Sequence, residues 1–282
     1  MKTIGVVGCG LMGSGIAQVA AQSGYKTVVV EVNDAVLKKG LDRISKTIDK
    51  GIAKGKITEE QAAQTRDNLQ GSAKLEDLKD CDLVIEAVIE NVEEKKKIFS
   101  KLDEITGPDT LLATNTSSVC VIELAAATKR PDKVLGLHFF NPVPVMKLVE
   151  VVKTIATSDS AVAQAREFVS SLRKEPITCP DTTAFVVNKL LVPYLLEAVR
   201  MFEEGRVSRE DIDKAMQLGC GYPMGPLTLL DFVGIDTTYY IANIMFDEFK
   251  DPRFAAPPLM KRMVLAGHWG KKAGKGFYDY TK

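Results

Sequence analysis

Short apolar segments alternate with longer amphipathic segments over the first half of the chain. The apolar segments do not alternate strictly between hydrophobic and polar residues, which is typical of parallel strands buried on both faces. Five of them are predicted strands: Thr3–Val7, Thr27–Glu31, Leu83–Ala87, Leu111–Thr114 and Val134–His138. Helical periodicity separates them, over Leu11–Gln22, Ala35 to about Leu69, and Val92–Leu102. This order predicts an α/β fold with a doubly wound, mostly parallel sheet.

The segment from Asn33 to Gly71 is longer than an ordinary crossover between parallel strands. It is rich in lysines and acids, and its helical pattern continues on both sides of Gly55-Lys56. We therefore expect a helical hairpin that projects from the sheet and turns near these two residues.

The pattern changes after Val152. Ala161–Leu172 is predicted to be helical, and Pro176–Thr178 a short edge strand. Later segments are almost all helical: Phe185–Glu204, Arg209–Leu218, Leu227–Val233, Thr237–Phe249 and Pro258–Ala266. Ser208 is a predicted helix N-cap, and predicted helix ends lie at Gly205, Gly219 and Gly221. Two domains are expected: an α/β domain over residues 1–184 and an all-helical domain over residues 185–282.

The composition excludes several classes of protein. Hydrophobic residues make up 45% and charged residues 26% of the 282 positions, as in soluble globular proteins. Lys+Arg and Asp+Glu both number 37, so no overall positive charge favours nucleic acid as a partner. No apolar run approaches the roughly 18–20 residues of a membrane span, and the glycines within Met1–Ala17 argue against a signal peptide. Neither a membrane nor a nucleic-acid partner is expected.

Cysteine and histidine usage narrows the chemistry further. The five cysteines are scattered and include no CxxC pair, which favours a reducing compartment and a cytoplasmic location. The only histidines are His138 and His268, so no metal site is expected.

A glycine-rich motif follows the first predicted strand. Gly8-Cys9-Gly10-Leu11-Met12-Gly13 matches the GxGxxG dinucleotide fingerprint between a strand and a helix. Glu31 ends the second predicted strand at about the 20-residue spacing of the acid that binds the adenosine ribose. No arginine follows Glu31 to bind a 2′-phosphate. These features predict a Rossmann-type domain that prefers NAD to NADP.

His138 ends a predicted strand, at the edge of the sheet where ligands bind in open α/β folds. An isolated histidine is more often structural than catalytic. Glu150, however, lies on an apolar face of the run Met146–Val152, where an acid is costly to bury unless it is paired. A turn at Asn141–Pro144 would bring it beside His138, where it would fix the imidazole tautomer. Both interpretations stay open on the pattern alone.

A third polar group, Asn115-Thr116-Ser117-Ser118, follows another predicted strand. Its side chains suit a substrate oxygen and a nicotinamide, and one of them could instead be an ordinary helix N-cap.

Several motifs together resemble the L-3-hydroxyacyl-CoA dehydrogenases, most closely the short bacterial 3-hydroxybutyryl-CoA dehydrogenases. They occur in order from residue 2 to residue 281: GCGLMGSGIA from Gly8, CDLVIEAVIE from Cys81, TNTSS from Thr114, LHFFNPVPVMKLVEVV from Leu137, NKLLVPYLLEA from Asn188, GYPMGPLTLLDFVGID from Gly221 and GKGFYDY from Gly274. The resemblance implies hydride transfer between NAD and an acyl-CoA, and a homodimer formed through the helical domain.

The resemblance also implies roles for individual residues. His138 would be the catalytic acid/base and Glu150 its orienting partner, with Ser117 and Asn188 near the reacting oxygen. Lys50 and Lys54 would bind the phosphates of coenzyme A. Further cofactor contacts are implied for Ala87, Glu90, Lys95, Asn115, Ser117, His138 and Asn141.

The chain departs from the family pattern at two places. Thr182-Thr183-Ala184-Phe185 stands where the family commonly has Thr-Pro-Gly-Phe, and Lys189 stands where arginine is usual. Two other functions remain possible: a crystallin-like structural protein that binds NAD without turnover, and a dehydrogenase of a hydroxy acid that carries no coenzyme A.

Overall fold

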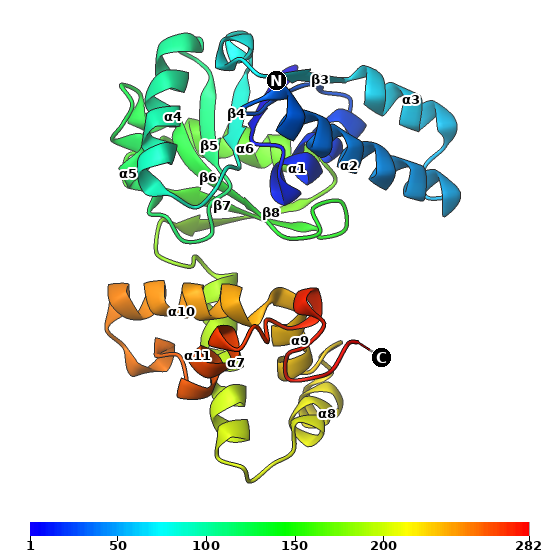
Figure 1. Cartoon of the computed structure of the whole chain (residues 1–282). Coiled ribbons are helices and arrows are strands. Elements are labelled where there is room, and N and C mark those ends of the chain that lie inside the picture. Colours follow the sequence, from blue (N-terminus) through cyan, green and yellow to red (C-terminus); the bar gives the residue numbers. More distant parts are fainter. Residues whose placement is uncertain (282) are drawn as a thin grey trace. The chain divides into compact units, whose positions relative to one another are not determined.

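The computed structural model describes residues 1–281 and separates the chain into two compact units (Figure 1). The first unit runs from Met1 to Thr182 and the second from Thr183 to Lys282. The N-terminal unit contains the sheet, and the C-terminal unit is helical.

One eight-stranded sheet forms the centre of the N-terminal unit, with the strand order β3-β2-β1-β4-β5-β6-β7-β8. Only the β6–β7 pair is antiparallel. The strands are β1 (Thr3–Val7), β2 (Lys26–Val30), β3 (Leu69–Ser72), β4 (Leu83–Glu86), β5 (Leu111–Thr114), β6 (Val134–Phe139), β7 (Leu148–Lys153) and β8 (Glu175–Pro180). The mostly parallel Rossmann-type sheet is as predicted, and β8 is an edge strand.

Helices connect these strands: α1 (Leu11–Gln22), α2 (Asp34–Ala53), α3 (Glu59–Asp67), α4 (Val92–Ile105), α5 (Val121–Ala125) and α6 (Asp159–Ser171). Short 3₁₀ turns span Leu75–Leu78 and Pro131–Lys133. Helices α2 and α3 form the projecting hairpin expected from the sequence (Figure 1). Gly55, in the turn between them, has a φ of 63°, which explains why glycine occupies it.

The central strands are apolar because both faces of the sheet are covered. Every residue of β4, β5 and β6 is buried. Glu86, Thr114 and His138 are the polar side chains among them. All three lie toward the carboxyl ends of their strands, so the sheet places these polar groups along the line formed by those strand ends.

Two elements of this unit differ from the sequence-based expectation. The hairpin segment was expected to extend to Gly71, but Leu69–Ser72 forms β3 as an outer strand of the sheet through pairing with β2. Helix α5 was not anticipated, because Asp181 at a distant position caps it by accepting from the Val121 and Ile122 amides at 2.9 and 2.7 Å. None of the residues Asn115–Ser118 is its N-cap, which is Cys120.

The C-terminal unit consists of α7 (Val187–Glu203), α8 (Arg209–Cys220), α9 (Pro226–Val233), α10 (Ile235–Phe249) and α11 (Pro258–Leu265), with 3₁₀ turns at Pro252–Phe254 and Lys271–Ala273. Ser208 caps α8 as predicted. Gly219 lies inside α8, contrary to expectation, whereas Gly221 is the C-cap of this helix as predicted, and its φ of 71° suits glycine.

A buried acid organises the end of this unit. Asp231 accepts hydrogen bonds from the Phe277 and Tyr278 amides at 2.9 Å and from the Tyr280 hydroxyl at 3.1 Å. Burial nevertheless raises the pKa of Asp231.

Across residues 1–281, no helix is both long enough and apolar enough to span a bilayer.

Candidate active site

The loop between β1 and α1 has the geometry that a dinucleotide requires. Gly8 adopts a φ of 94°, and a Cβ atom there would lie 2.7 Å from the Ala87 carbonyl oxygen. A Cβ atom on Gly13 would lie 1.9 Å from the Gly8 carbonyl oxygen, whereas the space around Gly10 is open within 4 Å. Gly10 is the N-cap of α1 and supplies no side-chain cap. The first turn of α1 therefore offers free amides and a positive dipole end to a pyrophosphate.

Glu31 lies beside this loop, directly after β2. Its Oε1 accepts a hydrogen bond from the Cys9 amide at 2.6 Å, and its Oε2 accepts from the Val32 amide at 3.0 Å. The two amides fix the carboxylate, whose remaining lone pairs can accept hydrogen bonds from ribose hydroxyls. The loop and Glu31 together fit the adenosine half of NAD.

His138 and Glu150 form a buried pair on the antiparallel strands β6 and β7. The two residues are directly opposite in the strand register, and His138 Nδ1 lies 2.6 Å from Glu150 Oε2. Glu150 is fully buried and the His138 side chain is 8% exposed. The Phe140 ring packs against the imidazole, with the centroids 4.5 Å apart. Since Glu150 engages Nδ1, the imidazole can keep Nε2 as its proton acceptor.

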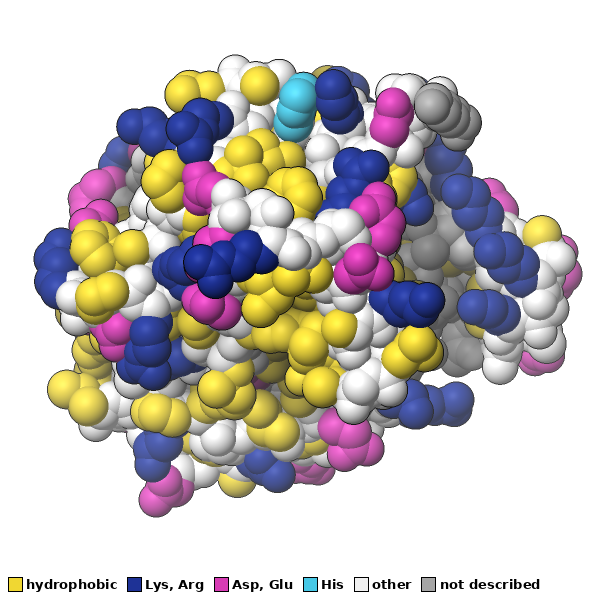
Figure 2. Space-filling model, turned by 90° about the horizontal axis from the view of Figure 1, so that it is seen from below, with side chains coloured by type: hydrophobic (Ala, Val, Ile, Leu, Met, Phe, Trp, Pro, Cys, Tyr) yellow, Lys and Arg dark blue, Asp and Glu magenta, His cyan; other side chains and the backbone are white. Residues whose placement is uncertain are grey.

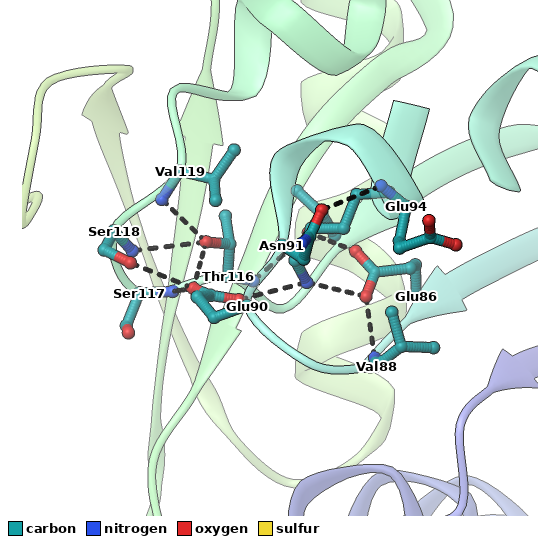
Figure 3. Close-up of polar contacts among 11 residues, drawn as sticks. Glu86, Val88, Glu90, Asn91, Glu94, Thr116, Ser117, Ser118 and Val119 are labelled. Atoms are coloured by element: carbon teal, nitrogen blue, oxygen red, sulfur yellow. Dashed lines mark hydrogen bonds and ion pairs between the residues drawn. The ribbon is translucent and has the colours of Figure 1, made fainter. Parts of the chain in front are cut away.

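A buried charge cluster lies at the carboxyl ends of β4 and β5 (Figure 3). Lys95 reaches from α4 and places its Nζ 2.7 Å from Glu86 Oε1 and 3.0 Å from Glu90 Oε2. Glu86 also accepts hydrogen bonds from the Val88 amide at 2.7 Å and from the Thr114 hydroxyl at 2.8 Å. We call Glu86, Lys95 and Glu90 the carboxylate–lysine cluster.

Glu90 ties this cluster to the turn after β5. Its Oε1 accepts from the hydroxyls of Thr116 and Ser118 and, at 3.0 Å, from the Ser117 amide. Burial alone would raise the pKa of Glu90, but Lys95 and the Thr116 hydroxyl outweigh it and hold the pKa below its usual value. Glu90 is consequently an anion that fixes the backbone carrying Ser117.

The remaining residues expected at the site fall into three groups. Asn115 links β5 to β6, because its side-chain oxygen accepts from the Phe139 amide at 2.9 Å, and Asn141 is exposed in the loop after β6. Lys50 in the last turn of α2 and Lys54 at its C-cap are exposed on the hairpin. Asn188 belongs to the first turn of α7 in the C-terminal unit.

Lys95 differs from the simple expectation of a cofactor contact. It is 1% exposed, and two carboxylates engage its ammonium group. In this arrangement Lys95 holds the Glu90 carboxylate in place and is itself shielded from solvent.

Glu86 and Thr114 did not emerge from the sequence as site residues. The sequence signal was present but weak: Glu86 is an acid that ends the apolar run of a buried strand, and such an acid needs a partner. Among the described residues, no group of three or more His, Cys, Asp or Glu side chains could hold a metal ion.

Comparison with known proteins covers both units. Residues 3–182 match the family model described as "3-hydroxyacyl-CoA dehydrogenase, NAD binding domain", and residues 185–280 match "3-hydroxyacyl-CoA dehydrogenase, C-terminal domain". The chain is 50% identical to a 3-hydroxybutyryl-CoA dehydrogenase of Mycobacterium tuberculosis over 99% of both chains. It is 45% identical to the mitochondrial hydroxyacyl-coenzyme A dehydrogenase of Sus scrofa, covering 99% of this chain and 91% of the relative.

Solved structures agree with these relatives. The crystal structure of (S)-3-hydroxybutyryl-CoA dehydrogenase PaaH1 from Ralstonia eutropha is 43% identical, with a TM-score of 0.96 and full coverage of both chains. FadB2 from M. tuberculosis is 50% identical with a TM-score of 0.97, covering 99% of this chain and 98% of that one. With both domain models matched and close relatives along the whole chain, the protein belongs to the NAD-dependent 3-hydroxyacyl-CoA dehydrogenase family.

Proposed function

We propose that the protein interconverts an L-3-hydroxyacyl-CoA, with 3-hydroxybutyryl-CoA as the expected substrate, and the corresponding 3-ketoacyl-CoA. The observation that supports this proposal best is the buried His138–Glu150 pair, which lies at the carboxyl end of β6, on the same side of the sheet as the glycine loop that follows β1. An acid/base next to a hydride acceptor is what the oxidation of a secondary alcohol needs.

In the proposed mechanism, Nε2 of His138 would remove the proton of the C3 hydroxyl as the C3–H bond of the substrate breaks. Bound NAD⁺ supplies the hydride acceptor. Glu150 holds the imidazole through Nδ1 and stabilises the imidazolium that forms. In the reverse direction, protonated His138 donates its proton to the C3 oxygen as the ketone is reduced.

Substrate contacts are proposed from the family resemblance for Ser117 and Asn188 at the C3 oxygen, and for Lys50 and Lys54 at the coenzyme A phosphates. The position of Ser117 supports its role: its amide donates to Glu90, and its hydroxyl makes no hydrogen bond within residues 1–281. The exposure of Lys50 and Lys54 supports their proposed role as phosphate contacts, because a solvent-exposed ammonium group can bind a phosphate directly.

A homodimer formed through the C-terminal unit is also proposed. Figure 2 shows a face of this unit on which hydrophobic side chains gather between charged ones. Large exposed hydrophobic residues of this unit include Leu190, Leu218, Phe232, Tyr240, Leu265 and Trp269. Apolar surface of this kind is typical of a protein interface.

The test is the loss of NADH absorbance when the purified protein is given acetoacetyl-CoA. The wild-type protein is expected to turn over, and His138→Asn is expected to lower kcat by roughly 10²–10⁴-fold, because general acid–base catalysis is lost. Absence of turnover in the wild type, with NADH still bound, would contradict the proposal and favour a structural NAD-binding protein. Near-normal kcat in His138→Asn would contradict the role of the histidine alone.

A further inference from the structure

We propose that Glu86 sets the relative affinity of the site for the two redox forms of the cofactor, by making the carboxylate–lysine cluster a net anion. Such an anion favours NAD⁺ over NADH. The inference rests on the proposed position of the nicotinamide near His138.

The first step is the charge of the cluster. Two carboxylates, Glu86 and Glu90, face the single ammonium of Lys95 at 2.7 and 3.0 Å. Glu86 receives three donors, from Lys95, the Val88 amide and the Thr114 hydroxyl, which is the environment of a carboxylate. The neighbouring Lys96 is engaged by Glu93 and Glu123 instead. One negative charge therefore remains in excess.

The second step is the environment of that charge. Glu86 is 0% exposed, Lys95 is 1% exposed and the Glu90 side chain is 27% exposed. Water therefore screens the inner part of the cluster poorly, and its field extends further than that of a surface ion pair. Glu90 is the only partly exposed member of the cluster, and it accepts hydrogen bonds from the Thr116–Ser118 turn (Figure 3).

The third step is the position of the cluster within the sheet. The pyrophosphate loop follows β1, and His138 lies at the end of β6. Strands β4 and β5 lie between them in the order β1-β4-β5-β6. A cofactor with its pyrophosphate at Gly10 and its reactive ring near His138 must cross the carboxyl ends of β4 and β5, where the cluster lies.

The consequence follows from the charge of the nicotinamide ring, which is positive in NAD⁺ and neutral in NADH. An anion near the ring stabilises the oxidised form selectively. With an effective dielectric constant near 20, a unit charge about 10 Å from the ring changes the relative affinity for NAD⁺ and NADH on the order of tenfold. Glu86 is the informative member of the cluster, because it is buried and can change the charge without touching a ligand.

Glu86→Gln removes the charge and keeps the shape. The glutamine oxygen can still accept from Lys95, and its amide can donate to the Thr114 hydroxyl oxygen, which already accepts from the Thr116 amide. The experiment measures the dissociation constants of NAD⁺ and of NADH separately, by titration calorimetry, for the wild type and this variant. The ratio Kd(NAD⁺)/Kd(NADH) is expected to rise on the order of tenfold.

Thr114→Val is the matched control, because it removes a hydrogen bond to Glu86 without changing the charge. Both dissociation constants can change in this variant, but their ratio is expected to stay within about twofold of the wild type. A merely structural role of Glu86 would likewise change both constants together. An unchanged ratio in a folded Glu86→Gln protein would overturn the proposal.

If Glu86→Gln does not fold, Glu90→Gln removes the same unit of charge, and the ratio Kd(NAD⁺)/Kd(NADH) of this second variant is expected to rise as well. An unchanged or lower ratio in Glu90→Gln would refute the proposal.

The measurement also separates this inference from the proposed reaction. If the ratio of dissociation constants shifts but the wild type does not turn over acetoacetyl-CoA, the effect of the charge is upheld and the proposed acyl-CoA substrate is rejected. A wild type that binds neither redox form would reject both.

Discussion

At the scale of single residues, the His138–Glu150 pair shows how the sheet produces chemistry. A one-residue shift in the β6–β7 register would turn Glu150 to the opposite face and leave the imidazole without its carboxylate. We therefore treat Glu150 as the residue that fixes the histidine tautomer in the proposed mechanism.

Replacing Glu150 with Gln tests this role. A neutral amide can still contact Nδ1 but does not stabilise an imidazolium, so kcat is expected to fall on the order of 10²–10⁴-fold, as in other histidine–acid pairs. Kinetics are measured beside a thermal melt. A normal kcat in a folded variant would show that the pair is structural.

A second residue-scale prediction concerns Arg173, which follows α6 with a φ of 58°. This left-handed conformation costs an L-residue about 1 kcal/mol or more, and glycine avoids that cost. We expect Arg173→Gly to have a free energy of unfolding about 1 kcal/mol above that of Arg173→Ala, the control that removes the same charge. Equal values in urea denaturation would contradict the strain.

The sequence identified some site residues and missed others for a physical reason. His138 and Glu150 were found because polar residues on apolar segments stand out. Lys95 was named only through the family resemblance, because it carries no local signal that separates it from Lys96 and Lys97 on the same helix. Its pairing with Glu86 depends on how α4 packs beside β4, which no local pattern contains.

At the scale of elements, segments whose own sequence carries a clear pattern were predicted well. Helix α1 and strands β1 and β5 begin and end where the sequence placed them. The elements that escaped, β3 and α5, are short and depend on partners elsewhere in the chain: β3 on β2, and α5 on Asp181. Tertiary contacts, and not local propensity, determine such elements.

The α2–α3 hairpin carries the prediction at this scale. Replacing both Lys50 and Lys54 with Ala is expected to raise KM for acetoacetyl-CoA several-fold, roughly 1 kcal/mol for two exposed charge contacts, with kcat little changed. Steady-state kinetics would measure this effect.

Two controls make the test specific. Lys38→Ala/Lys39→Ala removes the same charge from the beginning of α2, where both lysines are exposed, and is expected to leave KM unchanged. A thioester of acetoacetate that lacks the nucleotide should show the same KM with wild type and Lys50/Lys54 variant. Equal KM values for acetoacetyl-CoA in all three proteins would reject the phosphate contacts.

At the scale of the whole molecule, the balanced charge of the chain is compatible with a polyanionic substrate. With 37 basic and 37 acidic residues, the protein has no global field to attract coenzyme A. A few lysines on a projecting element can supply attraction locally. We infer that the affinity for the nucleotide part of the substrate depends on ionic strength mainly through these lysines.

The proposed dimer is the prediction for the whole molecule. Light scattering coupled to size exclusion is expected to give twice the mass of one chain over a range of concentrations, because a dimer with a large apolar interface stays associated on dilution. A mass equal to one chain at every concentration would contradict it.

The antiparallel join between β6 and β7 also bears on how this family can diverge. The loop over residues 140–147 lies outside both strands, so a change in its length would disturb the packing of Phe140 and Val143 but would leave His138 and Glu150 opposite each other in the register. A single deletion between Leu148 and Glu150 would instead displace the acid from its place opposite the imidazole. Length variation within the family should therefore spare the two strands that hold this pair.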